Sequence, residues 1–139
     1  MAAILLFTFF FSTTVFAQDE SPHIFTVSTF EFIFPDDGSI AEWDSLNTLF
    51  MENVINQNEY IVSQRVLRHR WGNNSLDIVY VSEYNSFTDI EKGQDRRTEL
   101  FNEAWATDEE RDAFNDALFR YFRNRHSDEI YQEVMNQRK

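Results

Sequence analysis

A chain of 139 residues is long enough for one domain with one hydrophobic core and too short for two domains of ordinary size. Its 24 acidic and 12 basic residues give a formal net charge of −12, so its surface repels phosphates, and nucleic acid is not an expected partner. The chain has no cysteine, which excludes disulfides and thiolate metal sites.

The first residues have the pattern of a secretory signal peptide. An uncharged, mainly apolar run from Ile4 to Phe16 ends in the small residue Ala17 and is followed by Gln18-Asp19-Glu20. The run is shorter than the roughly 18 to 20 apolar residues that a membrane-spanning helix needs. We therefore expect residues 1–17 to be cleaved, which leaves a single domain at residues 18–139. This domain is expected in the periplasm or outside the cell, without a membrane span, and the pattern does not separate a released protein from a membrane-associated one.

The first predicted element after the signal peptide is a strand from His23 to Phe34. The segment HIFTVSTFEFIF is rich in β-branched and aromatic residues, and it stops at the turn sequence Pro35-Asp36-Asp37-Gly38. Because apolar residues occur at both odd and even positions, we expect both faces of this strand to be covered at least in part.

An amphipathic helix is predicted from Ser39 to about Asn58. Ser39 is followed three residues later by Glu42, which is the pattern of a capping box. Apolar residues then recur at helical spacing, namely Trp43, Leu46, Phe50 and Val54. The solvated face is expected to carry Asp44, Asn47, Glu52 and Asn56.

A β-hairpin is predicted next, with strand-like runs at Tyr60–Trp71 and Leu76–Tyr84. Between them lies Gly72-Asn73-Asn74-Ser75, whose Gly and Asn residues tolerate the positive φ angles of a tight turn.

Two further helices are predicted after the hairpin. Thr88 and Glu91 form a capping box for the first, which Gly93 weakens. Its apolar residues are Ile90, Leu100, Phe101, Ala104 and Trp105. Thr107 and Glu110 form a capping box for the second. Its residues at helical spacing are Phe114, Ala117, Leu118, Tyr121 and Phe122, and the basic residues expected at its C-terminal end are Arg120, Arg123 and Arg125.

The predicted order is β-α-β-β-α-α, and the tail can be completed in two ways. If residues 129–135, EIYQEVM, form a strand, the chain is a β-α-β-β-α-β ferredoxin-like unit of the α+β class with an antiparallel sheet and a split second helix. If they form a helix, the sheet has only three strands.

This order, together with the segments EWDSLNTLF, RHRWGNNSLDIVYVSEYNSFTDIE and HSDEIY, resembles small exported bacterial proteins related to the dimeric α/β-barrel superfamily. The resemblance implies a homodimer in which two ferredoxin-like subunits pair their sheets face to face. It also implies a cavity between sheet and helices for a small molecule. Members of the superfamily include cofactor-free monooxygenases, haem-dependent enzymes and stress-responsive proteins, so the resemblance carries no single reaction and no catalytic residues are assigned.

Five residues are candidates for binding a ligand in such a cavity. Arg65 and His69 share one face of a predicted strand and would bind an anionic group, with Trp71 at the mouth of the cavity. Tyr80 and Tyr84 are of the type that lines small-molecule pockets. The alternative is that the basic residues form surface ion pairs with nearby carboxylates and that the aromatic residues belong to the core.

His126, Asp128 and Glu129 are weak candidates for a metal site. Imidazole and carboxylate groups bind divalent metals, but adjacent residues diverge in a strand and in a helix, so a further ligand would have to come from elsewhere. The alternative is that Ser127 or Asp128 caps a final helix or bounds a final strand.

The predicted function is therefore that of an exported, noncatalytic module that binds a small hydrophobic or anionic ligand, or a partner, without a cofactor. No glycine-rich phosphate loop, nucleophile elbow or recognisable catalytic triad occurs in the sequence. The alternative is an enzyme of the dimeric α/β-barrel type, either a cofactor-free monooxygenase or a haem-dependent enzyme, so haem is left open.

Overall fold

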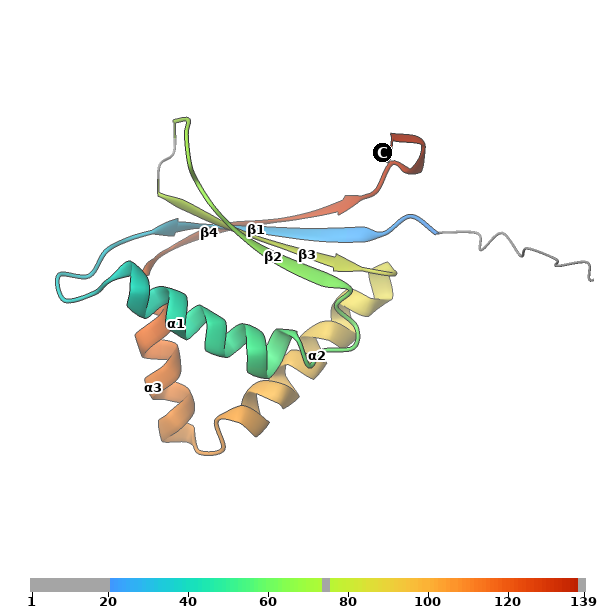
Figure 1. Ribbon diagram of the computed structural model, residues 1–139. Coiled ribbons are helices and arrows are strands. Elements are labelled where there is room, and N and C mark those ends of the chain that lie inside the picture. Colours follow the sequence, from blue (N-terminus) through green and yellow to red (C-terminus); the bar gives the residue numbers. More distant parts are fainter. Residues whose placement is uncertain (1–20, 74–75, 138–139) are drawn as a thin grey trace, which may run out of the picture.

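The computed structural model describes residues 21–73 and 76–137 and contains a four-stranded sheet with helices on one side (Figure 1). The predicted signal peptide and part of the hairpin turn, Asn74 and Ser75, lie outside the described residues. The elements in chain order are β1 (Ile24–Phe32), α1 (Ile40–Phe50), a π-helical turn (Met51–Ile55), β2 (Ser63–Arg68), β3 (Asp77–Tyr84), α2 (Phe87–Ala104), α3 (Asp108–Phe119), β4 (Phe122–Gln132) and a short 3-10 turn (Met135–Gln137).

The strands lie in the order β2-β3-β1-β4, and all neighbouring pairs are antiparallel. The register aligns Ser28 of β1 with Tyr80 of β3 and with Asp128 of β4. Since side chains alternate between the two faces of a strand, these three residues share one face of the sheet. The fold is therefore the α+β, antiparallel arrangement predicted for a tail that forms a strand.

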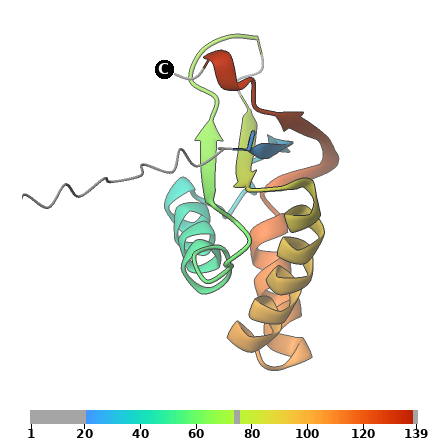
Figure 2. The same cartoon turned by 90° about the vertical axis from the view of Figure 1, so that its right-hand side faces the viewer.

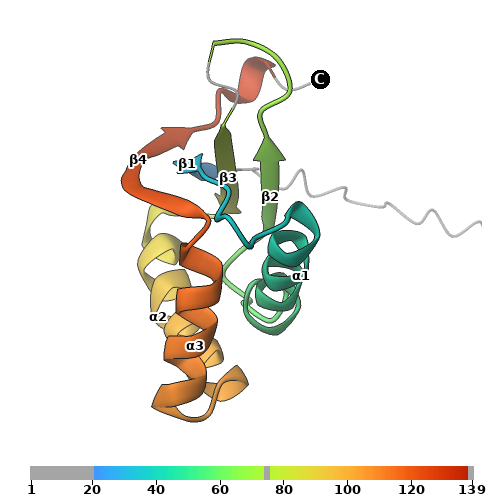
Figure 3. The ribbon, with the colours of Figure 1, turned by 90° about the vertical axis from the view of Figure 1, so that its left-hand side faces the viewer.

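All helices cover the same face of the sheet, as views from either side show (Figures 2 and 3). The main core lies between this face and the helices, where Phe32 and Ile78 of the sheet contact Trp43 of α1 and Phe114 of α3. A second cluster joins the π-helical turn to α2 through Val54, Ile55 and Leu100. Apolar spacing in the sequence identified most of these residues, because a helix that covers a sheet must direct one stripe of side chains inward.

The opposite face of the sheet is not covered by α1, α2 or α3, and the short 3-10 turn lies on that side past the end of β4 (Figure 1). The apolar residues of this face are Phe25, Val27, Leu67, Val79, Val81 and Tyr131, and they lie beside polar and charged residues such as Arg65 and Glu129. Half of the surface of the Leu67 side chain and a similar part of Tyr131 are exposed. We expected both faces of the first strand to be covered at least in part. Within a single chain, the helices cover only one of them.

Two of the three predicted helix caps are confirmed, and one is wrong. The Ser39 side chain accepts a hydrogen bond from the backbone N–H of Glu42, and Thr107 and Glu110 form a reciprocal capping box. The cap of α2 is Ser86 rather than Thr88, so the helix begins at Phe87. Serine two residues earlier has the extended backbone conformation that an N-cap requires.

Gly93 of α2 has a structural role that the sequence pattern did not indicate. The residue is buried, and a Cβ atom at this position would lie 3.1 Å from the Tyr84 ring of β3. The glycine therefore allows α2 to approach the sheet closely, at the expense of some helix propensity.

The predicted C-terminal end of α3 is wrong. The helix ends at Phe119, and Phe122, Arg123 and Arg125 belong to β4, which pairs with β1 along most of its length. The strand contains few apolar residues with a regular period, so its local sequence does not specify its conformation. Pairing with the edge of β1 does, because each paired backbone N–H and C=O group then gains a partner.

Candidate functional site

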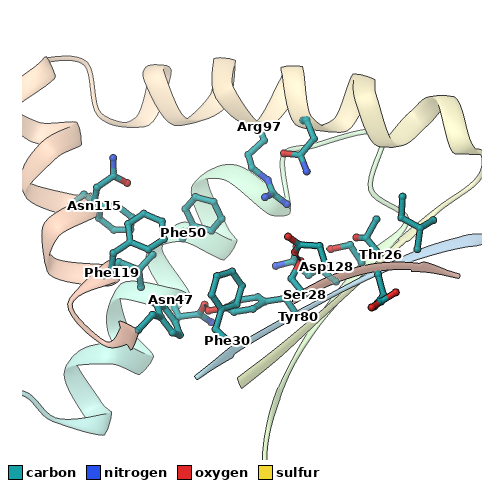
Figure 4. A pocket seen from close by; sticks show the side chains of 18 residues that line it. Thr26, Ser28, Phe30, Asn47, Phe50, Tyr80, Arg97, Asn115, Phe119 and Asp128 are labelled. Atoms are coloured by element: carbon teal, nitrogen blue, oxygen red, sulfur yellow. Dashed lines mark hydrogen bonds between the residues drawn. The ribbon is translucent and has the colours of Figure 1, made fainter. Parts of the chain in front are cut away.

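A cavity of about 320 Å³ lies between the covered face of the sheet and the three α-helices (Figure 4). Its volume is at the lower end of the range of small-molecule pockets. The aromatic and aliphatic part of its wall is formed by Phe30, Phe50, Phe114, Leu118, Phe119 and Phe122. Its polar wall is formed by Thr26, Ser28, Asn47, Gln64, Tyr80, Ser82, Gln94, Arg97, Asn115 and Asp128, and Glu129 and Ile130 of β4 complete the lining.

The apolar wall is built from aromatic contacts between elements that are distant in the sequence. The Phe30 ring of β1 meets Tyr80 of β3 edge-on at 5.7 Å between ring centroids and lies 5.2 Å from Phe122 of β4. On the helix side, Phe50 stacks on Phe114 at 6.4 Å. These contacts hold the rings in place, so the cavity is preformed rather than a gap between mobile side chains.

Two neutral hydrogen-bonded pairs lie in the wall of the cavity. Tyr80 Oη donates to Asn47 Oδ1 of α1 at 3.2 Å, and Ser82 Oγ donates to Gln64 Oε1 of β2 at 2.9 Å. Burial raises the pKa of the Tyr80 hydroxyl well above its ordinary value of 10.0, so the group stays protonated and acts as a donor. Its raised pKa makes Tyr80 unsuited to act as a proton acceptor near neutral pH.

Arg97 is the single basic residue in the wall of the cavity among the described residues. Its side chain extends from α2 toward the sheet (Figure 4). Its Nε atom is buried without a hydrogen-bond partner, and the guanidinium group forms no ion pair with any residue that the structure describes. Burial lowers the pKa of Arg97, and nearby Tyr84 opposes this effect, yet an arginine keeps its charge at neutral pH.

Asp128 also lines the cavity, and it already has two partners. Ser28 Oγ donates to Asp128 Oδ1 at 2.6 Å, and His126 Nε2 lies 3.0 Å from Asp128 Oδ2. The His126 ring also stacks on Phe30 at 5.1 Å. Asp128 therefore stays at the sheet, on the wall opposite α2, and does not form an ion pair with Arg97.

Of the five predicted ligand-binding residues, only Tyr80 lines this cavity. Arg65 pairs with Val81 and lies on the uncovered face of the sheet, so it cannot converge with a residue in the cavity. Trp71 is 93% exposed at the hairpin, and Tyr84 is buried against α2. His69 lies beside a separate, smaller hollow near Phe34 and Ile40.

The predicted metal cluster divides between the two faces of the sheet. His126 and Asp128 lie on the covered side, whereas Glu129 aligns with Val27 on the uncovered side. Within residues 21–73 and 76–137, no group of three or more histidine or acidic side chains is placed to hold a metal ion. The stretch is a strand, and its histidine and aspartate contact each other and the sheet.

Two cavity residues, Arg97 and Asn47, were missed in the sequence. Asn47 was assigned to the solvated face of its helix, but it lies four residues after Trp43 and three before Phe50, within the inward stripe. Arg97 similarly lies four residues after Gly93 and three before Leu100. A polar residue on an otherwise buried helical stripe is the signal that would have identified both of them.

No family model matches the chain, and no curated protein matches it either. Solved structures similar to it include a dimeric ferredoxin-like protein from an uncultured marine organism, with a TM-score of 0.53 and 11% identity over 82% of this chain and 97% of the other. The fold is ferredoxin-like. A NIPSNAP family protein of unknown function from Agrobacterium tumefaciens has a TM-score of 0.52 and 12% identity over 84% of this chain and 91% of the other. SnoaB, a cofactor-independent oxygenase from Streptomyces nogalater, has a TM-score of 0.50 and 14% identity over 82% and 95%.

The predicted resemblance to ferredoxin-like dimeric α/β proteins is thus confirmed at the level of the fold. Such low identities carry no reaction from one protein to another, because one fold hosts many functions. No helix in the described part of the chain is both long and apolar enough to cross a membrane.

Proposed function

We propose that this protein is a noncatalytic binding module that holds a small, mainly apolar molecule in the cavity between sheet and helices. The observation that carries the proposal is the preformed cavity, in which aromatic side chains from β1, β4, α1 and α3 form one wall and a few polar groups form the other. Small-molecule sites in proteins have this composition, since apolar surface supplies affinity and a few polar groups fix orientation.

The proposal includes export and dimerisation. Export is supported by the apolar run that ends at Ala17 in the sequence. A homodimer is supported by the uncovered apolar face of the sheet and by the description of one similar structure as dimeric. Two such faces in contact would remove apolar surface from water in both subunits.

The proposal includes no cofactor, in agreement with the description of SnoaB as cofactor-independent. Haem was left open by the sequence. The wall of the cavity contains no histidine among the described residues, so it does not fit a haem whose iron is held by an imidazole.

Binding can be tested with N-phenyl-1-naphthylamine, a neutral dye whose fluorescence rises in apolar sites. We expect saturable binding, and we expect Thr26→Phe to abolish it, because Thr26 lines the cavity and a phenyl ring there would occupy the space. Thr48→Phe is the matched control, since this residue is exposed on α1 and lies neither in the cavity wall nor on the sheet face proposed for the dimer. Equal binding by both variants would place the dye outside the cavity and contradict the proposal.

A second candidate is an oxygenase that needs no cofactor, as SnoaB is described. The observation that favours it is the cation of Arg97 in a mainly apolar cavity, where it would stabilise the anion of a deprotonated aromatic substrate. Oxygen uptake with 1,4-dihydroxynaphthalene that exceeds autoxidation and is lost in Arg97→Met would support this candidate over a noncatalytic module.

A further inference from the structure

We infer that the cavity selects an amphipathic monoanion, a molecule with an apolar body and one carboxylate or sulfonate group that binds Arg97. The inference rests on the proposed function and adds to it the chemical class of the ligand. It depends on three observations. Arg97 has no ionic partner among the described residues, the carboxylate of Asp128 lies in the opposite wall, and the rest of the cavity wall is mainly apolar.

Arg97 differs from the other described arginines because it is partly buried and has no ionic partner. Arg65, Arg68, Arg70 and Arg125 form no ion pair with a described residue either, but they are exposed to water. Arg96, Arg111, Arg120 and Arg123 each lie within 4.0 Å of an acidic side chain. The chain has twice as many acidic as basic residues, so carboxylates are plentiful. Arg97 nevertheless forms no ion pair within the described part of the chain, and its Nε atom is buried without a partner.

An unpaired guanidinium group in a mainly apolar cavity is unfavourable in the free protein. Removing a charge from water is costly unless another charge or several hydrogen bonds compensate for it. A ligand carboxylate would provide both, because its two oxygens match the planar fork of donors on a guanidinium group. The missing partner of Arg97 is therefore best supplied by the ligand.

Asp128 limits the ligand to one negative charge near this end of the cavity. Its carboxylate is held at the sheet by Ser28 and His126, on the wall that faces Arg97 (Figure 4). A second anionic group would approach this carboxylate and be repelled by it. A single anion at Arg97 is repelled less strongly than a second one would be, and it gains the pairing with the arginine.

The remainder of the cavity sets the character of the ligand body. Phe30, Phe50 and Phe119 lie on the side of the cavity away from the guanidinium group (Figure 4). Phe119 is 55% exposed and Ile130 is 52% exposed, so the cavity also has an apolar rim. These surfaces favour an aromatic or aliphatic body, with the charged group at one end.

The inference can be tested with a matched pair of dyes of similar shape. The neutral dye is N-phenyl-1-naphthylamine, and the anionic dye is 1-anilinonaphthalene-8-sulfonate. We expect Arg97→Met to weaken binding of the sulfonate about 10- to 100-fold, which is the contribution of hydrogen bonds to a charged group, and to leave binding of the neutral dye nearly unchanged. Arg96→Met is the matched control, because it removes the same charge one residue away and outside the cavity wall; its dissociation constants should equal those of the wild type.

A second variant tests the role of the Asp128 carboxylate. Asp128→Asn removes the negative charge that faces Arg97, so we expect it to strengthen binding of the sulfonate several-fold without affecting the neutral dye. If Arg97→Met weakened both dyes equally, or neither, the inference would be wrong, although the proposed function would stand as long as Thr26→Phe still abolished binding. If neither dye bound the wild type, the proposed function itself would fail.

Discussion

Replacement of Arg97 by methionine should stabilise the protein while it weakens the binding of anions. The buried Nε of Arg97 has no partner, and burial lowers the pKa of the side chain, so the charged form is held in an unfavourable environment. An unpaired buried polar group costs about 1–3 kcal/mol in proteins. Methionine has a similar unbranched, apolar stem, so the packing of the stem is largely retained.

We therefore expect Arg97→Met to raise the free energy of unfolding by about 1–3 kcal/mol, which for a chain of this size raises the melting temperature by about 4–12 °C. Differential scanning calorimetry of the dye-free protein measures this change. Arg96→Met should not raise the melting temperature, because Arg96 is paired with Glu59, Glu99 and Glu103. A lower melting temperature for Arg97→Met would show that Arg97 supports the fold, and the argument for a ligand anion would lose its basis.

Three further predictions concern the dimer, the anchor of the first helix and the cavity tyrosine. Leu67→Asp should convert the dimer to a monomer in light scattering, because Leu67 lies on the uncovered sheet face. Leu49→Asp should leave the dimer intact, since Leu49 has a similar exposed fraction, 46% against 50%, but does not lie on that face. A dimeric Leu67→Asp protein would place the interface elsewhere. Tyr121→Phe should lower the free energy of unfolding by about 1–3 kcal/mol in urea titrations, because the buried hydroxyl donates to Glu42 at 2.6 Å and accepts from the Ser39 N–H at 3.0 Å; an unchanged midpoint would contradict this. Tyr80→Phe should reduce the loss of stability above pH 10. The pKa of the Tyr80 hydroxyl is raised in the folded state, so just above its ordinary value of 10.0 this hydroxyl loses its proton only in the unfolded chain. The wild type should then lose about 1.4 kcal/mol per pH unit more than the variant, and parallel pH profiles would refute the assignment.

Several elements of the fold were predictable because their signals are local. Ser39 and Thr107 cap helices through hydrogen bonds that span three residues, and the stripe from Trp43 to Val54 follows from the helical period alone. The strand pattern of β1 and of the hairpin strands is equally local. The ferredoxin-like order of elements could be stated from the sequence for this reason, apart from the tail.

The site could be predicted only in part, because it depends on contacts between distant residues. Tyr80 was identified as a pocket residue, but the two residues expected to bind with it lie elsewhere. The sheet separates Arg65 from the cavity, and His69 lies beside a different hollow. The choice of covered face determines which alternate residues of a strand can meet a ligand. That choice is made by the helices, and no strand carries the information on its own.

The sequence by itself determined the acidity of the chain, most of its helices and the strands up to Tyr84. The tertiary structure decided that residues 122–132 form a strand and that Arg97 and Asp128 line the same cavity. The physical reason is the same in both cases. β4 gains its hydrogen bonds from β1, about a hundred residues earlier in the chain, as in the contact between Ser28 and Asp128. Arg97 acquires its environment from cavity residues on two other helices and on the sheet. Interactions over such separations leave no periodic signal in the residues that take part in them.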